Sequence, residues 1–193
     1  MNTTNRLIHS VASQASLYLD STTSTPRWFT HILDSYLAGQ SALPPYLGLK
    51  IDDYHHLLAI TGCTDNPIEH NAQARLIRQE LNLLRQSEQQ ELIQLLQPYA
   101  NKDEEYLTSL TITIISHASL GGQHLWHDLG LPNRDELSKM MRFHFPELFA
   151  LNNKNMRWKR FFYRQMCQQG GDYVCRSPSC EDCSSYEECF APS

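Results

Sequence analysis

Four cysteines near the end of the chain constrain this sequence more than any other feature. They follow the spacing C-x4-C-x2-C-x5-C, so that four of the six cysteines of a 193-residue chain fall within 15 positions: Cys175, Cys180, Cys183 and Cys189. Chance does not account for such a cluster, and we expect all four sulfurs to bind one group. The neighbouring residues favour turns, which predicts a coil-rich cysteine tail over residues 170–193.

Several kinds of site use clustered cysteines. Zinc accepts four thiolates, although structural zinc sites usually pair two short knuckles across a longer loop. Disulfides need an oxidising compartment, and a redox pair of Cys180 and Cys183 alone would leave the two outer cysteines unexplained. Iron–sulfur clusters are held by thiolates, and C-x4-C-x2-C is the leading spacing of plant-type ferredoxins. The spacing therefore favours an iron–sulfur site and leaves a zinc site as the alternative.

Composition and the N-terminal segment indicate where in the cell the protein acts and which partners it lacks. Residues 1–20 lack the long apolar run of a secretory signal, and no stretch approaches the roughly 18 apolar residues of a membrane-spanning helix. We therefore expect a cytoplasmic protein that does not bind a membrane. The net charge of −5 argues against a general nucleic-acid binder. In a reducing compartment, dense cysteines indicate metal or redox chemistry before disulfides.

Hydrophobic periodicity is helical through most of the chain. It predicts an all-α, bundle-like domain over residues 1–169, followed by the cysteine tail. The run TITII, within residues 103–122, has the β-branched composition of a strand. The length of that segment, its acidic start and its closing glycine pair instead favour a buried helix.

Local signals place the helix ends. Ser87 with Gln90 resembles a capping box and divides the long apolar pattern after residue 68 into two helices. Asn133 with Glu136 forms a second such pattern. Helices are accordingly expected over residues 25–39, 51–62, 68–86, 87–98, 103–122, 132–145 and 153–169.

The last expected helix, residues 153–169, is basic. Between residues 154 and 164 it has five basic side chains and no acidic one. At about 100° per residue, one stripe of the helix contains Arg157, Arg160 and Arg164. A neighbouring face would pack on the core through Trp158, Phe161 and Phe162. The arginine stripe is either a solvated face or a patch that attracts an oxyanion and balances an anionic cluster.

Two further residues are candidates for a role at the metal. Cys167 lies one turn beyond Arg164, so the basic helix would bring a fifth thiol towards the start of the tail. Nearby cations lower the pKa of a thiol and make it a better ligand. The chain also has nine histidines, and among them His124 is the candidate ligand.

Three stretches, HLWHDLGL, MRWKRFFYRQMC and CRSPSCEDCSSYEECF, together resemble the NifQ family of nitrogen-fixation proteins. The resemblance is close from about residue 115 onwards and looser over residues 1–110. It implies an iron–sulfur protein that carries molybdenum in a mixed Mo–Fe–S cluster. It also implies that the chain donates molybdenum to the nitrogenase iron–molybdenum cofactor, with the NifEN scaffold and the nitrogenase iron protein NifH as partners and molybdate as the oxyanion.

The resemblance assigns the cluster to the four tail cysteines, with Cys167 as an associated thiol and His124 as a further candidate. One segment departs from the family pattern, because SHASLGGQ stands before HLW where the family tends to have a cysteine and acidic residues. No nucleophile triad, phosphate loop or carboxylate pair indicates catalysis, so we expect a carrier and not an enzyme. The alternatives are a zinc-stabilised interaction module and an iron–sulfur redox protein.

Overall fold

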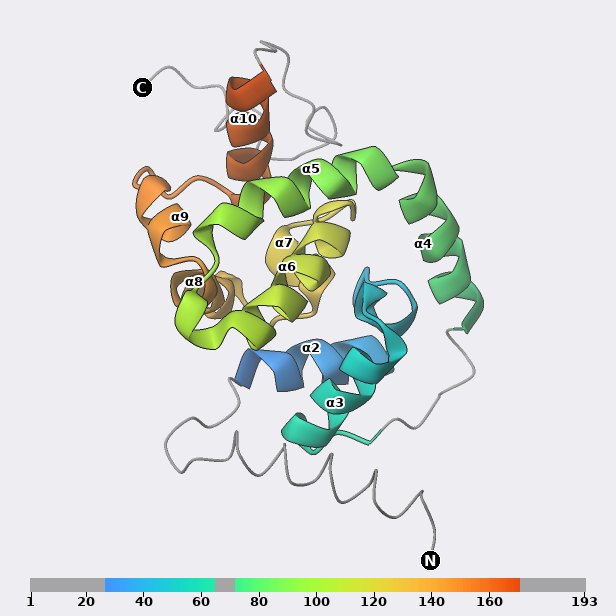
Figure 1. Ribbon diagram of the computed structural model, residues 1–193. Helices are drawn as coiled ribbons and strands as arrows, with labels where there is room; N and C mark the ends of the chain where they lie inside the picture. The colour runs from blue at the N-terminus through green and yellow to red at the C-terminus, as the bar shows by residue number, and fades with distance from the viewer. Residues whose placement is uncertain (1–26, 65–71, 171–193) are drawn as a thin grey trace, which may run out of the picture.

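The computed structural model describes residues 27–64 and 72–170. All regular elements in these two ranges are helices, and they form a bundle (Figure 1), which confirms the predicted all-α class. The α-helices are α2 (Arg27–Leu37), α3 (Ile51–Thr61), α4 (Ala72–Leu84), α5 (Gln86–Leu96), α6 (Glu105–Ser119), α7 (Leu125–Leu129), α8 (Arg134–His144), α9 (Pro146–Leu151) and α10 (Trp158–Gly170). Short 3₁₀ turns are η1 (Pro45–Gly48), η3 (Gln97–Tyr99) and η4 (Lys102–Glu104).

The core is built around α6, the helix that contains the TITII run. Ile114 and Ile115 are fully buried, and so are the hydroxyl side chains of Thr108 and Thr111. The Thr111 hydroxyl donates to the Leu107 carbonyl one turn back, so its polar group is satisfied within the helix. Because α5 and α7 pack on α6, burial on several sides overrides the strand preference of its β-branched residues.

Several predicted helix ends are confirmed. Gly39 and Gly62 follow α2 and α3 with φ of 73° and 71°, a left-handed conformation that suits glycine. The Asn133 side chain accepts from the backbone N–H of Glu136 at 2.9 Å and caps α8. These ends depend on one or two local residues, which is why the sequence predicts them.

One predicted helix cap and one predicted helix start were wrong. The long pattern after residue 68 does divide, but at Arg85, whose φ is −116°, and not through a capping box at Ser87. The last helix begins at Trp158 instead of residue 153. The Asn152 side chain bonds both the backbone N–H and the carbonyl of Met156, and Asn155 has a φ of 52°, so this segment forms a turn.

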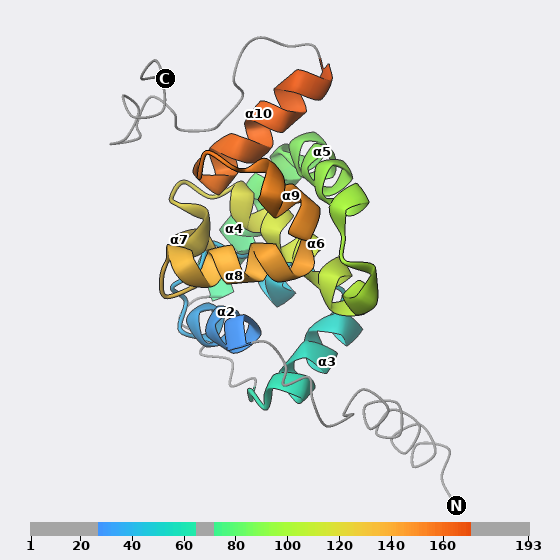
Figure 2. The ribbon, with the colours of Figure 1, turned by 90° about the vertical axis from the view of Figure 1, so that its left-hand side faces the viewer.

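Figure 2 shows α10 at the end of the molecule opposite α2 and α3. Its C-terminal end at Gly170 leads into residues 171–193, which lie outside the described residues. The division between a helical domain and a cysteine tail therefore stays a prediction. Within the described ranges, no helix is long and apolar enough to cross a membrane.

Candidate metal and anion site

The four tail cysteines lie outside the residues that the structure describes, so the ligand set Cys175, Cys180, Cys183 and Cys189 stays a prediction. The structure does describe the helix that leads to them. Cys167 is half-buried in the last turn of α10 and forms no disulfide with another described residue. It is the described thiol nearest to the tail along the chain, and its association with the cluster stays a prediction.

The base of α10 is packed firmly on the core. The predicted aromatic face is confirmed, because Trp158, Phe161 and Phe162 are at most 4% exposed. The Trp158 and Phe161 rings meet edge to face with centroids 5.6 Å apart. Tyr163 is also fully buried, which the sequence did not predict. The tail therefore follows a helix whose first two turns are held in place.

A hydrogen-bonded cluster fixes Tyr163 against the break between α4 and α5. The Tyr163 hydroxyl donates to the Glu88 carboxylate. Arg85 donates to the same carboxylate through Nε and Nη2, each 2.7 Å from a carboxylate oxygen. Burial, followed by the hydrogen bond to Glu88, raises the pKa of Tyr163. Arg85 also donates to the Leu120 carbonyl at 2.6 Å, so the end of α6 joins the same cluster.

Lys159 connects α10 to the loop in front of α7. Its ammonium donates to the Gly121 carbonyl at 2.7 Å and pairs with the Asp128 carboxylate, and the two side chains are only 13% and 4% exposed. The Gln123 N–H also donates to Asp128, at 3.0 Å. A Cβ at Gly121 would meet this carboxylate at 2.5 Å, so the loop and the ion pair fit closely. The HLWHDLGL and MRWKRFFYRQMC stretches are thereby joined through one buried ion pair.

His124 precedes α7 and lies on the exposed side of this junction. Its carbonyl accepts from the N–H groups of His127 and Asp128, which starts the short helix. Partial burial and then the positive charges of Arg157, Lys159 and Arg134 lower the pKa of His124, against the opposing effect of Asp128. The imidazole is therefore held neutral, the form that can ligate a metal.

Two of the three arginines of the predicted stripe, Arg160 and Arg164, lie within α10, and the role of the stripe in anion binding stays a prediction. Arg157 stands just before α10, and its carbonyl accepts from the Phe161 N–H. Arg160 is half-buried and Arg164 is exposed one turn later, with its guanidinium 3.8 Å from the Met156 sulfur. Arg134 adds a further cation from α8, where it binds the carbonyls of Asn155 and Met156. Arg157, Lys159 and Arg134 all lie close enough to His124 to lower its pKa, so positive charge from α8 and from the start of α10 gathers there.

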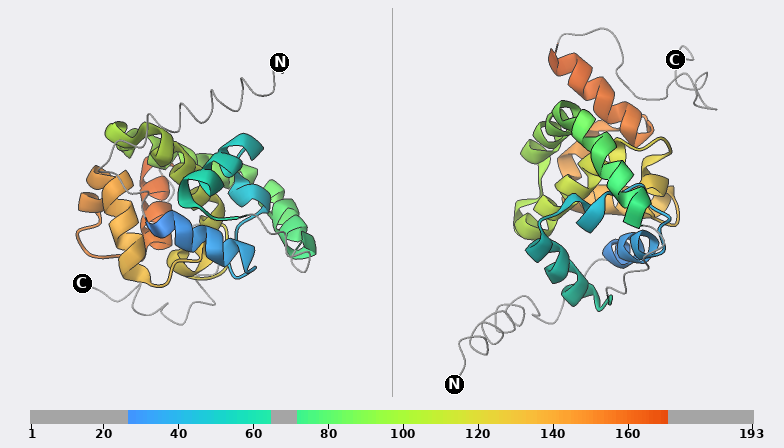
Figure 3. Two further views of the ribbon diagram at one scale, coloured as in Figure 1. Left: turned by 90° about the horizontal axis from the view of Figure 1, so that it is seen from below. Right: turned by 90° about the vertical axis from the view of Figure 1, so that its right-hand side faces the viewer.

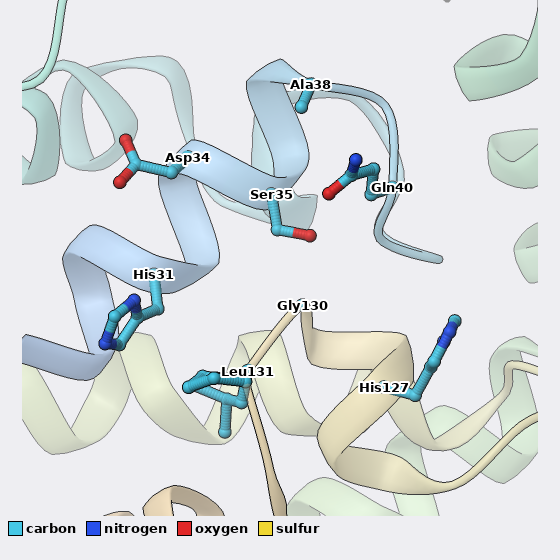
Figure 4. A pocket seen from close by; sticks show the side chains of 9 residues that line it. His31, Asp34, Ser35, Ala38, Gln40, His127, Gly130 and Leu131 are labelled. Atoms are coloured by element: carbon cyan, nitrogen blue, oxygen red, sulfur yellow. The ribbon is translucent and has the colours of Figure 1, made fainter.

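Two other candidate regions are less suited to hold a metal. His117 is already held between the side-chain amides of Asn82 and Gln89, at 3.1 and 2.9 Å. A groove of about 440 Å³ lies where α2 meets the end of α7 (Figure 4). Its lining is His31, Asp34, Ser35, Ala38, Gln40, His127, Gly130, Leu131 and Pro132. Among the described residues, no three His, Cys, Asp or Glu side chains gather as a metal site requires.

Sequence reasoning missed the residues that hold this region together: Lys159, Asp128, Arg134, Arg85, Glu88 and Tyr163. One local signal was available for Lys159. It directly follows Trp158 on a helix whose aromatic residues were expected to be buried. A lysine in that place indicates a partly buried ammonium that needs an acidic partner. Its partner Asp128 is 31 positions away and could not be paired with it from periodicity.

Comparison with known proteins identifies the family. The family model NifQ matches residues 28–191. The NifQ protein of Azotobacter vinelandii is 41% identical over 170 residues, which cover 84% of this chain and 86% of that protein. The NifQ protein of Klebsiella pneumoniae is 38% identical over 165 residues, or 84% of this chain and 96% of the relative.

The match therefore extends well into residues 28–110, where the resemblance was expected to be loose. No solved structure matches the chain. Because the family model spans residues 28–191 and the relatives are aligned over 84% of the sequence, this chain belongs to the NifQ family of nitrogen-fixation proteins.

Proposed function

We propose that this chain carries molybdenum in a Mo–Fe–S cluster and donates it for assembly of the nitrogenase iron–molybdenum cofactor. The observation that supports this most strongly is the presence, in a NifQ-family chain, of four clustered cysteines next to a basic helix. Iron and reduced molybdenum are both thiophilic, so thiolates suit each metal of such a cargo.

The ligands would come from the tail, with support from the described part of the chain. Cys175, Cys180, Cys183 and Cys189 would hold the cluster as thiolates. Cys167 stands at the end of α10 and would supply a fifth thiol. The neutral imidazole of His124 would supply a nitrogen ligand, since its lowered pKa leaves a lone pair unprotonated near neutral pH.

The cations around the start of α10 would attract the oxyanion from which the molybdenum comes. Molybdate is a dianion, and Arg157, Arg160 and Arg164 place positive charge along the helix that leads to the thiols. Arg134 reinforces this charge from α8. Positive charge would bring molybdate towards the thiols. Its entry into a reduced sulfide cluster would then need an external electron donor, sulfide, and protons that remove the oxo groups as water.

The chain would then transfer molybdenum to another protein and would not catalyse the turnover of a substrate. We propose that it acts in the cytoplasm, where thiols stay reduced, as a carrier rather than an enzyme. Its partners would be the NifEN scaffold, which receives the molybdenum, and the iron protein NifH. Nucleic acid and membrane are not among the proposed partners.

The direct test is to replace the two central cysteines of the tail. We expect the double variant Cys180→Ser/Cys183→Ser to co-purify with at least about tenfold less iron and molybdenum per chain than the wild-type protein, because two thiolate ligands are removed. Cys63→Ser is the matched control, since Cys63 packs against the helical core and lies outside the tail. Metal analysis of anaerobically purified proteins measures both. Metal content unchanged in the double variant would refute the proposed ligand set.

A further inference from the structure

Helix α4 is attached to the rest of the molecule through its polar side. The Arg75 guanidinium donates to the Tyr36 carbonyl at 2.8 Å and lies 4.0 Å from the centre of the Tyr36 ring. Asn82, two turns later, approaches the His117 ring nitrogen at 3.1 Å. Figures 1 and 3 show α4 along one edge of the bundle, where the right-hand view of Figure 3 looks directly at it.

The apolar side of α4 is the side that faces outwards. Its five large apolar side chains are all more than half exposed, and Leu84 is 83% exposed: Leu76, Ile77, Leu81, Leu83 and Leu84. This is the reverse of an ordinary surface helix, whose apolar stripe faces the core. Five such side chains make an apolar patch of roughly 500 Å², the size of the largest apolar patch on a typical monomer, which is often functional.

One carboxylate lies in the middle of this patch. On a helix, the neighbours of residue 80 on the surface are three and four positions away, namely Leu76, Ile77, Leu83 and Leu84. Glu80 is exposed and is therefore ringed by four exposed apolar side chains. We call these five residues the Glu80 ring. A surface that covers the ring removes water from the carboxylate and must provide it with a cation.

A second copy of this chain is a poor occupant. Two Glu80 rings placed face to face bring two carboxylates together in an apolar contact, which is unfavourable. The nearby arginines do not relieve this. Arg75 is bound to Tyr36, and Arg85, just after the helix, is bound to Glu88. Arg78 is half-buried, and at about 100° per residue it lies on the side of Asn82, away from Glu80. The complement of the Glu80 ring is instead an apolar surface that contains one cation.

We propose that the outward face of α4 docks a helix of a partner protein whose apolar stripe is interrupted by a single Lys or Arg opposite Glu80. Two apposed patches of this size bury roughly 1,000 Å² in total, which suits a transient contact better than a permanent one. The proposed contact uses only residues of α4, and none of them is among the proposed metal ligands. It therefore does not depend on which metal the chain carries.

Binding of three labelled helical peptides to the full chain tests this proposal. The peptides share one apolar stripe and differ only in a central Lys, norleucine or Glu, and their affinities are measured by fluorescence anisotropy. We expect the Lys peptide to bind at least about tenfold more tightly than the norleucine peptide, because only the former pairs with Glu80. Glu80→Gln should remove this preference, and Glu80→Lys should transfer it to the Glu peptide.

Matched variants elsewhere on the surface provide the controls. Glu147→Lys makes the same charge change on α9, and Leu151→Gln removes an exposed leucine there, so both should leave the Lys-peptide affinity unchanged. Leu84→Gln should weaken it. Equal affinities of the three peptides for the wild-type chain would overturn the proposal. So would a concentration-dependent dimer, seen by sedimentation, that Leu84→Gln dissociates, since the occupant would then be a second copy.

Discussion

Replacing Lys159 with methionine is expected to lower the free energy of unfolding by about 3–5 kcal/mol, because the Asp128 carboxylate is left buried without its cation. Methionine preserves most of the volume of the lysine stem, so little of the loss would come from a cavity. The loop before α7 would lose its tie to α10 through the Gly121 carbonyl as well. Denaturant titration at neutral pH measures the effect.

A surface pair of similar chemistry gives the control. Lys139 bonds Glu136 at 2.7 Å, but the Lys139 side chain is 65% exposed, so Lys139→Met should change stability by less than about 1 kcal/mol. Adding Asp128→Asn to Lys159→Met should restore part of the loss, since the unpaired charge is removed. If Lys159→Met and Lys139→Met lower the free energy of unfolding by the same amount, the ion pair with Asp128 does not hold α10 to the loop before α7.

Mild acid is expected to destabilise the fold through His144. This side chain is fully buried, its Nδ1 lies 2.9 Å from the Thr108 hydroxyl, and the Trp28 indole N–H donates to its Nε2 at 3.3 Å. Since an indole nitrogen is only a donor, Nε2 must be the acceptor and Nδ1 carries the proton. Burial lowers the pKa of His144 to about 3.

The sign of the pH dependence follows from that lowered pKa. In the unfolded chain the histidine takes up a proton near pH 6.5, whereas the folded chain takes it up only near pH 3. Stability contributed by neutral His144 is therefore present above pH 6.5 and is lost as the pH falls towards 3. Between pH 7.5 and 5, one such group contributes a loss of about 2 kcal/mol.

A histidine substitution isolates this contribution. His144→Gln removes the titrating group, so the difference in unfolding free energy between pH 7.5 and 5 should shrink by about 2 kcal/mol. Burial lowers the pKa of His117 to about 4, so this histidine would cause part of the pH dependence of stability that remains in the variant. His55→Gln changes an exposed histidine and should leave the difference as it is. An unchanged difference in His144→Gln would show that another group causes the acid sensitivity.

The helices were predictable because their signals are local. Segment length, an acidic start and a closing glycine pair predicted the helix that contains TITII, and single residues such as Gly62 and Asn133 marked ends that the structure confirms. The same periodicity did not tell which side of a helix faces the core. The apolar residues of α4 have the spacing of a buried stripe, yet they are exposed, because Arg75 and Asn82 hold the other side of the helix to the core.

The sequence predicted only those features of the candidate site that depend on local patterns. Spacing alone singled out the four tail cysteines, and the aromatic face of the last helix was confirmed. The joining of His124 to α10 depends on contacts between residues far apart in the chain, such as Asp128 with Lys159. Contacts of that kind are properties of the fold, and a single sequence contains no local pattern from which to infer them.

The most direct measurement is metal analysis of the full chain purified without oxygen from cells supplied with molybdate, together with its visible spectrum. We expect iron, acid-labile sulfide and molybdenum in a brown protein, because four thiolates and the adjacent cations suit a Mo–Fe–S cargo. A colourless protein that contains zinc and neither iron nor molybdenum would contradict the carrier function. The cysteine tail would then be a zinc-stabilised module on a NifQ-family fold.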